Sequence, residues 1–138
     1  MGTRFVASSE FAGSEDWKKM IVAADAEDTV QTDALEPIMP PYTMAAPWHG
    51  RERMLRSPFL AQWDGRTDEL AERADELGPE VIAAILAGDG HEYVPFAGQS
   101  VGLIGDILPA AEIVRRTVEE AQNALARAVV PPVASEGA

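Results

Sequence analysis

The N-terminal residues, MGTRF, are the first candidate for ligand chemistry. A Gly-Thr pair beside an apolar strand end offers two backbone amides and a hydroxyl, which together can hold a phosphate group. We interpret Gly2 and Thr3, followed by Phe5 and Val6, as the end of a buried strand that runs into such a turn. An ordinary turn is the commoner use of these residues. Phosphate sites do recur, however, in the loops after strands 7 and 8 of parallel eight-stranded barrels.

The other polar residues do not assemble into a catalytic set. His49 and His91 each lack a second histidine or cysteine at ligand spacing, so we expect surface histidines and no metal site. Glu69, Glu72 and Glu76 recur at helical spacing, which is typical of a solvated face. Because nucleophile, base and orienting group cannot be combined, we assign no catalytic residue.

An acidic chain with one small basic island is a poor ligand for polyanions. The 138 residues carry 11 basic and 23 acidic side chains, a net charge of −12. This balance argues against nucleic acid and anionic membranes as partners. We expect the arginines of the island to pair with neighbouring acidic helices rather than to bind an anion. The island consists of Arg51, Arg53, Arg56 and Arg66.

The length and composition predict one soluble domain. A chain of this size can bury a single core. Cysteine is absent, and no apolar stretch approaches the roughly 20 residues that cross a bilayer. We place the chain in the cytoplasm as the simplest setting.

The clearest elements are helices. Ser14 is suited to cap a helix over residues 14–24, whose apolar stripe includes Trp17 and Ile21. Thr67 is suited to cap a helix over 67–77, which Gly78 and Pro79 should end. A second helix over 79–87 would then form a helical hairpin with it. The last helix, over 109–128, has Pro109 in its first turn, and we expect a flexible tail at 131–138.

The intervening segments contain strands, breaks and turns. We expect a short second strand near residues 28–32 (DTVQT), and a loop or linker over 35–50, where prolines are frequent. Pro58 should break the segment RERMLRSPFLAQW into one helix before it and a short helix after it. Gly98, Gly102 and Gly105 allow the backbone to turn or to approach another surface closely.

The ordered set of motifs resembles one family. MGTRF, DTVQT, GRERMLRSPFLAQW and FAGQSVGLI followed by PAAEIV are similar, in this order, to the C-terminal part of nitronate monooxygenases, formerly called 2-nitropropane dioxygenases. The resemblance runs from Met1 to about Leu125. Members of that family are FMN-dependent (β/α)₈ barrels with an added, largely helical substrate domain. They oxidise alkyl nitronates with dioxygen to a carbonyl compound and nitrite.

The resemblance implies a cofactor site. Met1, Gly2 and Thr3 match the family segment at the end of the last barrel strand, whose amides hold the FMN phosphate. Gly98 and Gln99 match a loop near the flavin or substrate cavity. The family's catalytic histidine lies upstream of the matched part, and neither histidine of this chain corresponds to it.

The resemblance also implies a fragment: a mainly α chain that holds the last strand, the helical lid and the final helix of a TIM barrel. Residues 1–130 would be the barrel part, divided into the last strand with its following helix (1–26), the lid (27–96) and the AGQ loop with the C-terminal helix (97–130). A whole barrel needs roughly 250 residues. We therefore expect this chain alone to be inactive and not to retain FMN, with the missing N-terminal barrel part as a partner.

Two alternatives stay open. One is a related FMN-dependent NAD(P)H quinone or enoyl-thioester reductase, which would share the phosphate turn. The other is a non-catalytic acidic helical module that binds a protein partner through its amphipathic last helix.

Overall fold

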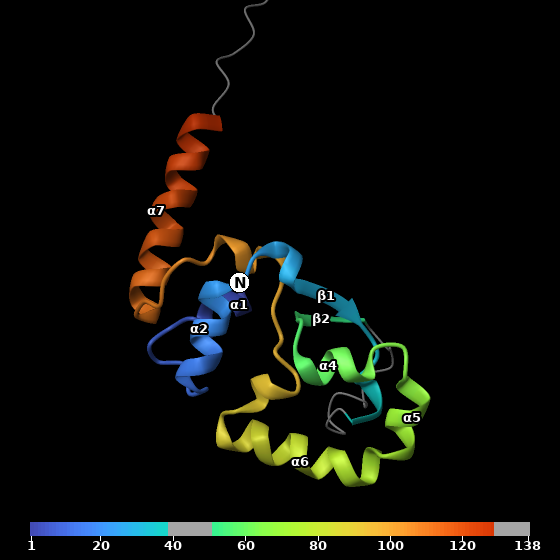
Figure 1. Cartoon of the computed structure of the whole chain (residues 1–138). Helices are drawn as coiled ribbons and strands as arrows, with labels where there is room; N and C mark the ends of the chain where they lie inside the picture. The colour runs from blue at the N-terminus through green and yellow to red at the C-terminus, as the bar shows by residue number, and fades with distance from the viewer. Residues whose placement is uncertain (39–50, 129–138) are drawn as a thin grey trace, which may run out of the picture.

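A computed structural model of the chain describes residues 1–38 and 51–128 (Figure 1). These residues are mostly helical, as expected, and they contain one two-stranded antiparallel sheet. His49, most of the proline-rich segment and the tail at 131–138 lie outside the described residues. The elements are α1 (Gly2–Val6), α2 (Glu15–Ala23), the 3₁₀ turns η1 (Ala26–Asp28), η2 (Glu36–Ile38), η3 (Gly90–Glu92) and η4 (Gln99–Leu103), the strands β1 (Thr29–Thr32) and β2 (Glu52–Leu55), and the helices α4 (Pro58–Trp63), α5 (Thr67–Glu72), α6 (Ala74–Ala87) and α7 (Ala110–Ala128).

The opening strand predicted at the N-terminus is wrong. Residues Gly2–Val6 form the short helix α1 instead. A strand leaves its amides and carbonyls unpaired unless a neighbouring strand is present, whereas a helical turn pairs them within the segment. The turn is closed locally by Arg4 N–H on the Met1 carbonyl and by Ser8 N–H on the Phe5 carbonyl.

The helix at α2 is confirmed together with its cap. Ser14 has extended backbone angles, and its hydroxyl accepts the N–H of Trp17. Glu15 and Asp16 occupy the first turn, where the helix dipole favours acidic groups. Ile21 of the predicted apolar stripe is fully buried.

The strand predicted near 28–32 is confirmed as β1, but the helix predicted before Pro58 is wrong. Residues Glu52–Leu55 form β2, which pairs with β1 from Thr29 opposite Leu55 to Thr32 opposite Glu52. Met54 and Leu55 point to opposite faces of the sheet and are both buried. Burial on both faces hides the alternation of polar and apolar residues that would have indicated a strand.

The break at Pro58 and the short helix after it are confirmed. Ser57 has extended backbone angles, as the residue before a proline should, and its hydroxyl caps α4 by accepting the N–H of Leu60. Pro58 occupies the first turn, where no intrahelical bond is lost.

The helical hairpin predicted around Gly78 and Pro79 is wrong. The helix predicted over 67–77 is interrupted earlier, at Arg73, and the following helix α6 continues through Gly78 and Pro79. Pro79 cannot donate the bond that its amide would make to a carbonyl one turn earlier. Leu77 and Val81 on either side of it are buried, and their burial holds the helix together. Thr67 is the first residue of α5 and not its cap. The predicted end at residue 87 is confirmed, because α6 ends at Ala87 and Gly88 follows in the left-handed region with φ of 89°.

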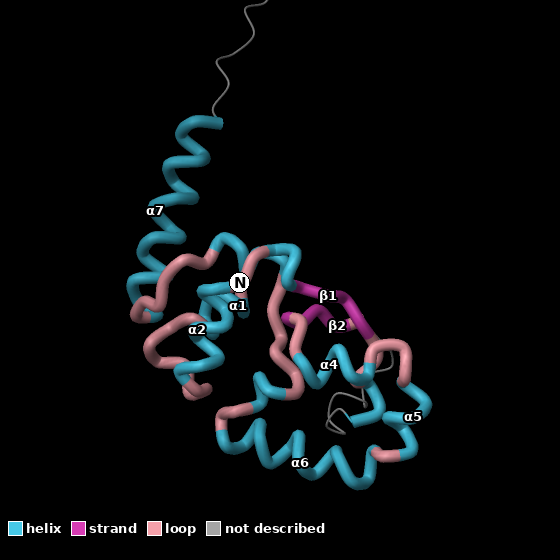
Figure 2. Tube along the Cα trace, in the orientation of Figure 1, coloured by secondary structure: helices cyan, strands magenta, loops and turns pink. Residues whose placement is uncertain are grey.

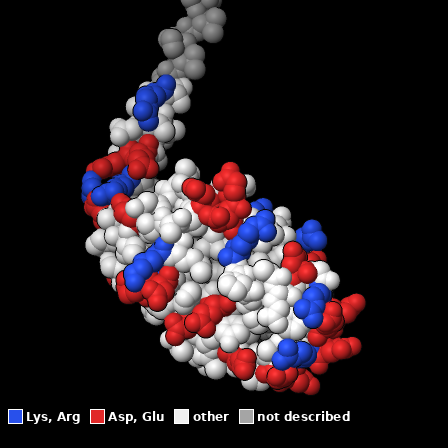
Figure 3. Space-filling model, viewed as in Figure 1, with Lys and Arg blue, Asp and Glu red and all other residues white. Residues whose placement is uncertain are grey.

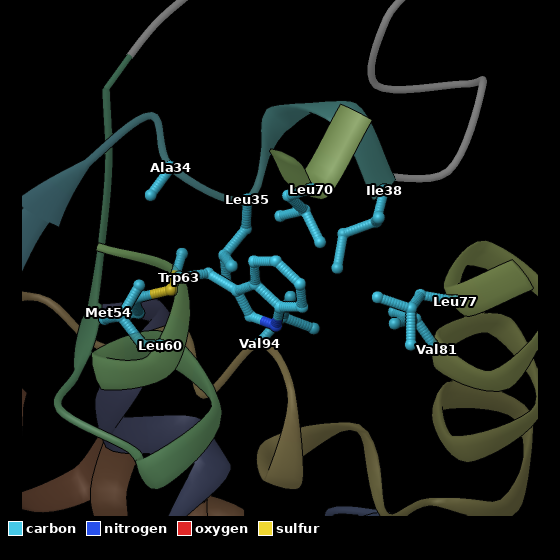
Figure 4. Close-up of a cluster of buried hydrophobic side chains, with 10 residues drawn as sticks. All are labelled: Ala34, Leu35, Ile38, Met54, Leu60, Trp63, Leu70, Leu77, Val81 and Val94. Atoms are coloured by element: carbon cyan, nitrogen blue, oxygen red, sulfur yellow. The ribbon is translucent and has the colours of Figure 1, made fainter. Parts of the chain in front are cut away.

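Buried side chains form two clusters. The first core cluster lies between the sheet and α4, α5 and α6 (Figure 4). It contains Ala34, Leu35, Ile38, Met54, Leu60, Trp63, Leu70, Leu77, Val81 and Val94. The second core cluster lies against α1, α2 and η4, and contains Ala7, Ile21, Leu55, Ala97, Val101 and Ile104.

The backbone between η3 and η4 runs between these two groups of helices (Figure 2). Its residues are held against β2, because Leu55 N–H donates to the Pro95 carbonyl and Ala97 N–H donates to the Arg53 carbonyl. A bridge between Met54 and Phe96 adds to this pairing. The segment therefore reaches η4 at a position fixed by the sheet.

Helix α7 follows η4 and projects from the rest of the molecule (Figure 1). Its predicted start is confirmed, since the Pro109 carbonyl accepts the N–H groups of Glu112 and Ile113. Ile113 is buried, but Val118 and Leu125 of the predicted apolar stripe are exposed. No helix among the described residues is long and apolar enough to cross a bilayer.

Candidate functional site

The fold brings together the two segments to which the sequence assigned cofactor contacts. Gly98 donates its backbone N–H to Oγ1 of Thr3 over 2.9 Å, although 95 residues separate them in the chain. A hydroxyl that accepts one hydrogen bond keeps its own proton free to donate. At this contact Thr3 Oγ1 can therefore donate toward an anion.

Thr3 is positioned by the anchoring of α1. Arg4 donates from Nη1 to the Asp106 carbonyl and from Nη2 to Asp106 Oδ1, both over 2.6 Å. Met1 is the N-cap residue of α1 and makes no side-chain capping bond. The amides of a first helical turn have no intrahelical partner, so those of Gly2 and Thr3 add donors next to the Thr3 hydroxyl.

Gly98 is positioned by the edge of β2 and by the start of η4. Its carbonyl accepts the N–H of Val101 over 3.0 Å, and the preceding Ala97 N–H is held by β2. Gln99 is the first residue of η4, and both Gln99 and Met1 are exposed. Of the five predicted cofactor residues, Thr3 and Gly98 are thus in direct contact, and Met1, Gly2 and Gln99 are their chain neighbours.

Neither glycine is required here by the backbone or by the described neighbours. A Cβ at Gly98 would lie 3.5 Å from Thr3 Oγ1, an ordinary contact, and a Cβ at Gly2 would meet nothing within 4 Å. Both have φ outside the left-handed region. The described residues therefore give no steric reason for a glycine at either position.

A second parallel contact closes the same region. Ser9 N–H donates to the Leu108 carbonyl over 3.0 Å, and Leu108 N–H donates to the Ala7 carbonyl over 3.3 Å. Glu10 Oε2 accepts the N–H of Ala110 at the start of α7, and this bond lowers the pKa of the Glu10 carboxyl. The segments at 3–10 and 98–110 are therefore joined along their length.

His91 is not the surface histidine that the sequence predicted. It is buried in η3, its ring stacks on Trp17 at a centroid distance of 5.8 Å, and its Nδ1 lies 3.3 Å from Ser14 Oγ. Ser14 is committed to capping α2, where its oxygen accepts the Trp17 N–H. We interpret this pair as a link between α2 and the end of α6 and not as a nucleophile with its base.

Two arginines of the basic island form ion pairs within the protein, as expected. Arg51 bonds to Asp33 over 3.3 Å and Arg66 to Glu69 over 2.6 Å. Arg53 donates to Thr29 Oγ1 over 3.0 Å. Acidic and basic side chains are mixed over the visible face (Figure 3). Glu69, Glu72 and Glu76 are exposed, which confirms the solvated face.

Carboxyls of β2 and α7 also have shifted pKa values. Burial, with Glu36 nearby, raises the pKa of Glu52 on β2. Hydrogen bonds from Arg115 and then Arg116 lower the pKa of Glu112 on α7 to about 2. In residues 1–38 and 51–128, no group of three His, Cys, Asp or Glu side chains is arranged to hold a metal ion.

These features describe a mainly helical unit in which Thr3 and Gly98, far apart in the sequence, are in direct contact. No protein-family model matches the chain. Nitronate monooxygenase npaC from Metarhizium robertsii is 32% identical over 134 residues, which are 94% of this chain and 36% of that protein. The resemblance to nitronate monooxygenases drawn from the motifs is confirmed over this portion.

Two solved structures share the fold. The M276A mutant of FabK from Thermotoga maritima superposes with a TM-score of 0.62 at 30% identity, covering 92% of this chain and 35% of that one. FabK from the same organism gives a TM-score of 0.59 at 28% identity, with 92% and 37% coverage. The chain therefore spans about a third of the length of the relatives it matches.

Proposed function

We propose that this chain is the C-terminal part of an FMN-dependent (β/α)₈ barrel that acts as a nitronate monooxygenase. Residues 1–26 and 97–130 would belong to the barrel and would supply the cofactor residues Met1, Gly2, Thr3, Gly98 and Gln99. Residues 27–96 would form the substrate lid. The observation that carries the proposal is the hydrogen bond from Gly98 N–H to Thr3 Oγ1, because it unites the two segments that the resemblance assigns to the cofactor.

The residues present fit one side of an FMN phosphate. The Thr3 hydroxyl and the amides of Gly2 and Thr3 can donate to phosphate oxygens, and Gly98 and Gln99 would lie nearer the flavin ring. Bound FMN would carry electrons from an alkyl nitronate to dioxygen. This chain's own part is to hold the phosphate and to enclose the substrate. No catalytic residue is assigned to it.

There is a second candidate for the activity of the whole protein. Similarity to FabK favours an FMN-dependent enoyl-thioester reductase. An assay of the whole protein with propionate-3-nitronate, set against NAD(P)H oxidation with an enoyl thioester or a quinone, separates the two activities. Nitronate-independent NAD(P)H oxidation would favour the reductase.

A chimera tests the cofactor site. In it, this chain replaces the matched third of npaC, and flavin binding is followed by fluorescence. We expect FMN to be retained. Thr3→Val, which keeps the shape and removes the hydroxyl, should weaken binding about tenfold to a hundredfold, because a hydrogen bond to a charged group is lost.

Thr3→Ser is the matched control and should bind FMN nearly as well as the unaltered chimera. The isolated 138-residue chain should not bind, because a few donors cannot offset a loss of freedom estimated at roughly 4–15 kcal/mol. If the Thr3→Val chimera bound FMN as tightly as the unaltered chimera, this would contradict the assigned phosphate site. Saturable micromolar binding by the isolated chain would mean that the site is more complete than proposed.

A further inference from the structure

Arg56 differs from the rest of the basic island in its side-chain contacts. Arg51 and Arg66 form ion pairs, and Arg53 donates to Thr29. Among the residues that the structure describes, none forms an ion pair or a hydrogen bond with the Arg56 side chain. A guanidinium carries five N–H donors in a planar arrangement that matches a carboxylate. Those of Arg56 are available to a ligand.

Arg56 borders a pocket of about 160 Å³ between the sheet and α4. A cavity of about 150 Å³ is large enough for a benzene ring, so this pocket can hold a small organic molecule. Its other lining residues are Val30, Thr32, Leu60, Ala61 and Asp64.

The sheet supplies one wall of the pocket. Val30 and Thr32 are alternate residues of β1 and therefore share one face. Arg56 belongs to the same face, because Val30 is paired with Met54, two residues before it. The Arg56 backbone N–H donates to the Asp28 carbonyl, at the other end of β1 from Thr32. At about 3.3 Å per residue, these two ends are roughly 13 Å apart along the strand.

Helix α4 supplies the other wall. Asp64 follows Ala61 by three residues and Leu60 by four, so the three lie on one side of the helix. The helix starts beside the end of β2 and runs back along the strand pair toward the end of β1 (Figure 1). The pocket therefore has Arg56 at one end, and Asp64 with Thr32 at the other.

The middle of the pocket is apolar, and its second end is rich in acceptors. Leu60 is a member of the first core cluster, and Val30 packs against that cluster. Asp64 makes no ion pair and no side-chain hydrogen bond in the described part of the chain. Thr32 Oγ1 accepts the N–H of Ala34 over 3.0 Å, which leaves the hydroxyl proton free to donate.

We propose that this pocket binds a small ω-amino carboxylate. Its carboxylate would bond to Arg56, its methylene chain would cover Val30 and Leu60, and its ammonium would bond to Asp64. A ligand with one charge would leave either the guanidinium or the carboxylate of the pocket unpaired. The inference goes beyond the proposed function and does not depend on it, because the pocket shares no residue with the contact between Thr3 and Gly98.

Titration of the 138-residue chain with ε-aminocaproate, followed by amide NMR, tests the pocket. We expect saturable shifts at Thr32, Arg56 and Asp64, with a dissociation constant of about 1 mM or tighter. Hexanoate lacks the ammonium and hexylamine lacks the carboxylate. Each should bind at least tenfold more weakly, because a hydrogen bond to a charged group is lost.

Two substitutions separate the ends of the pocket. Arg56→Gln and Asp64→Asn should each weaken binding of ε-aminocaproate at least tenfold. Arg56→Gln should remove its advantage over hexylamine, and Asp64→Asn its advantage over hexanoate. Both side chains are exposed, so both variants should keep the urea midpoint of the parent chain. The matched control is Arg127→Gln on α7, at an exposed arginine outside the pocket, which should leave binding unchanged.

Equilibrium dialysis of ε-aminocaproate against the single-chain chimera with npaC repeats the measurement in a longer chain. It should give the same affinity and the same losses. No binding to the chimera, shifts confined to residues outside the pocket, or equal losses with Arg127→Gln would each overturn the pocket. Hexanoate that binds as tightly as ε-aminocaproate would overturn the assigned ligand class. A chimera that retains FMN without binding ε-aminocaproate contradicts the pocket alone, and the reverse result contradicts the proposed function alone.

Discussion

The two core clusters are built from the chain in different ways. Every member of the first core cluster comes from the single stretch between Ala34 and Val94. The second joins Ala7 and Ile21, near the start, to Val101 and Ile104, near the end of the described chain. Met54 and Leu55, neighbours on β2, belong to the first and the second cluster respectively. One strand thus separates a local core from one assembled across long distances in sequence.

The comparison shows where the contacts of the candidate site are. The link from Thr3 to Gly98 and the pair Arg4–Asp106 both lie on the side of the second cluster. The second core cluster has six buried residues, whereas the first has ten. The region that carries the candidate site therefore has the smaller buried core to support it.

The largest expected effect is on the free energy of unfolding. It compares the truncation of one buried residue in each cluster. Leu70→Ala in the first core cluster should lower the free energy of unfolding by about 3–5 kcal/mol, and Ile21→Ala in the second by about 2–3 kcal/mol. Both side chains are 0% exposed, so the difference should come from how far each site can relax around the cavity. Urea unfolding measures both. A larger loss for Ile21→Ala would contradict the contrast between the clusters.

The next prediction concerns a close approach at the second cluster. A Cβ at Gly102 in η4 would lie 2.9 Å from the Ala26 backbone nitrogen in η1. Because backbone atoms cannot yield as a flexible side chain can, Gly102→Ala should destabilise the chain by about 1–3 kcal/mol.

Gly105→Ala is the control for this substitution. Nothing lies within 4 Å of a Cβ there, and its φ is outside the left-handed region, so this change should be neutral or stabilising by up to about 1 kcal/mol. Thermal unfolding of the two variants provides the measurement. Similar midpoints for both would show that η1 and η4 are not tightly apposed.

The smallest expected effect is on the helical signal of α7, through its exposed ion pairs. Arg115 and Arg116 lower the pKa of Glu112 from 4.5 to about 2. A carboxyl whose pKa is lower in the folded chain stabilises the fold above its ordinary pKa, and this stabilisation is lost as the pH falls from about 4.5 toward 2. The helical signal of α7 should decline over that window, and high salt should weaken the dependence because the pairs are exposed.

Far-UV circular dichroism during an acid titration checks this prediction. Glu112→Gln should flatten the decline. Glu120→Gln should not, because Glu120 forms no ion pair in the part of the chain that the structure describes. A titration curve left unchanged by Glu112→Gln would argue that these pairs do not support α7.

Local signals in the sequence were enough to predict much of the fold. Ser14, Pro58 and Gly88 act within a few residues of themselves, so the cap of α2, the break before α4 and the end of α6 could be predicted from the chain. The errors came from tertiary context. Among residues 1–38 and 51–128 no strand lies beside the N-terminal segment, which forms α1, and burial on both sides of β2 hides its alternation.

The candidate site was predictable only in pieces. Thr3 follows from the chemistry of a Gly-Thr pair, and Gly98 came from the family resemblance. Their hydrogen bond spans 95 residues and leaves no periodic pattern in the sequence. His91 was missed for the same reason, because its contacts with Ser14 and Trp17 reach across 77 and 74 residues.

The distance in sequence between the two halves of the site has a consequence for how the chain folds. Contacts that close long loops form late, because the loop-closure entropy must be overcome before the contact contributes. The first core cluster can condense from residues 34–94 alone, and only then are the ends of the chain brought near enough for Thr3 to meet Gly98. We therefore expect the contact between Thr3 and Gly98 to be the last part of this chain to form, after the first core cluster has folded.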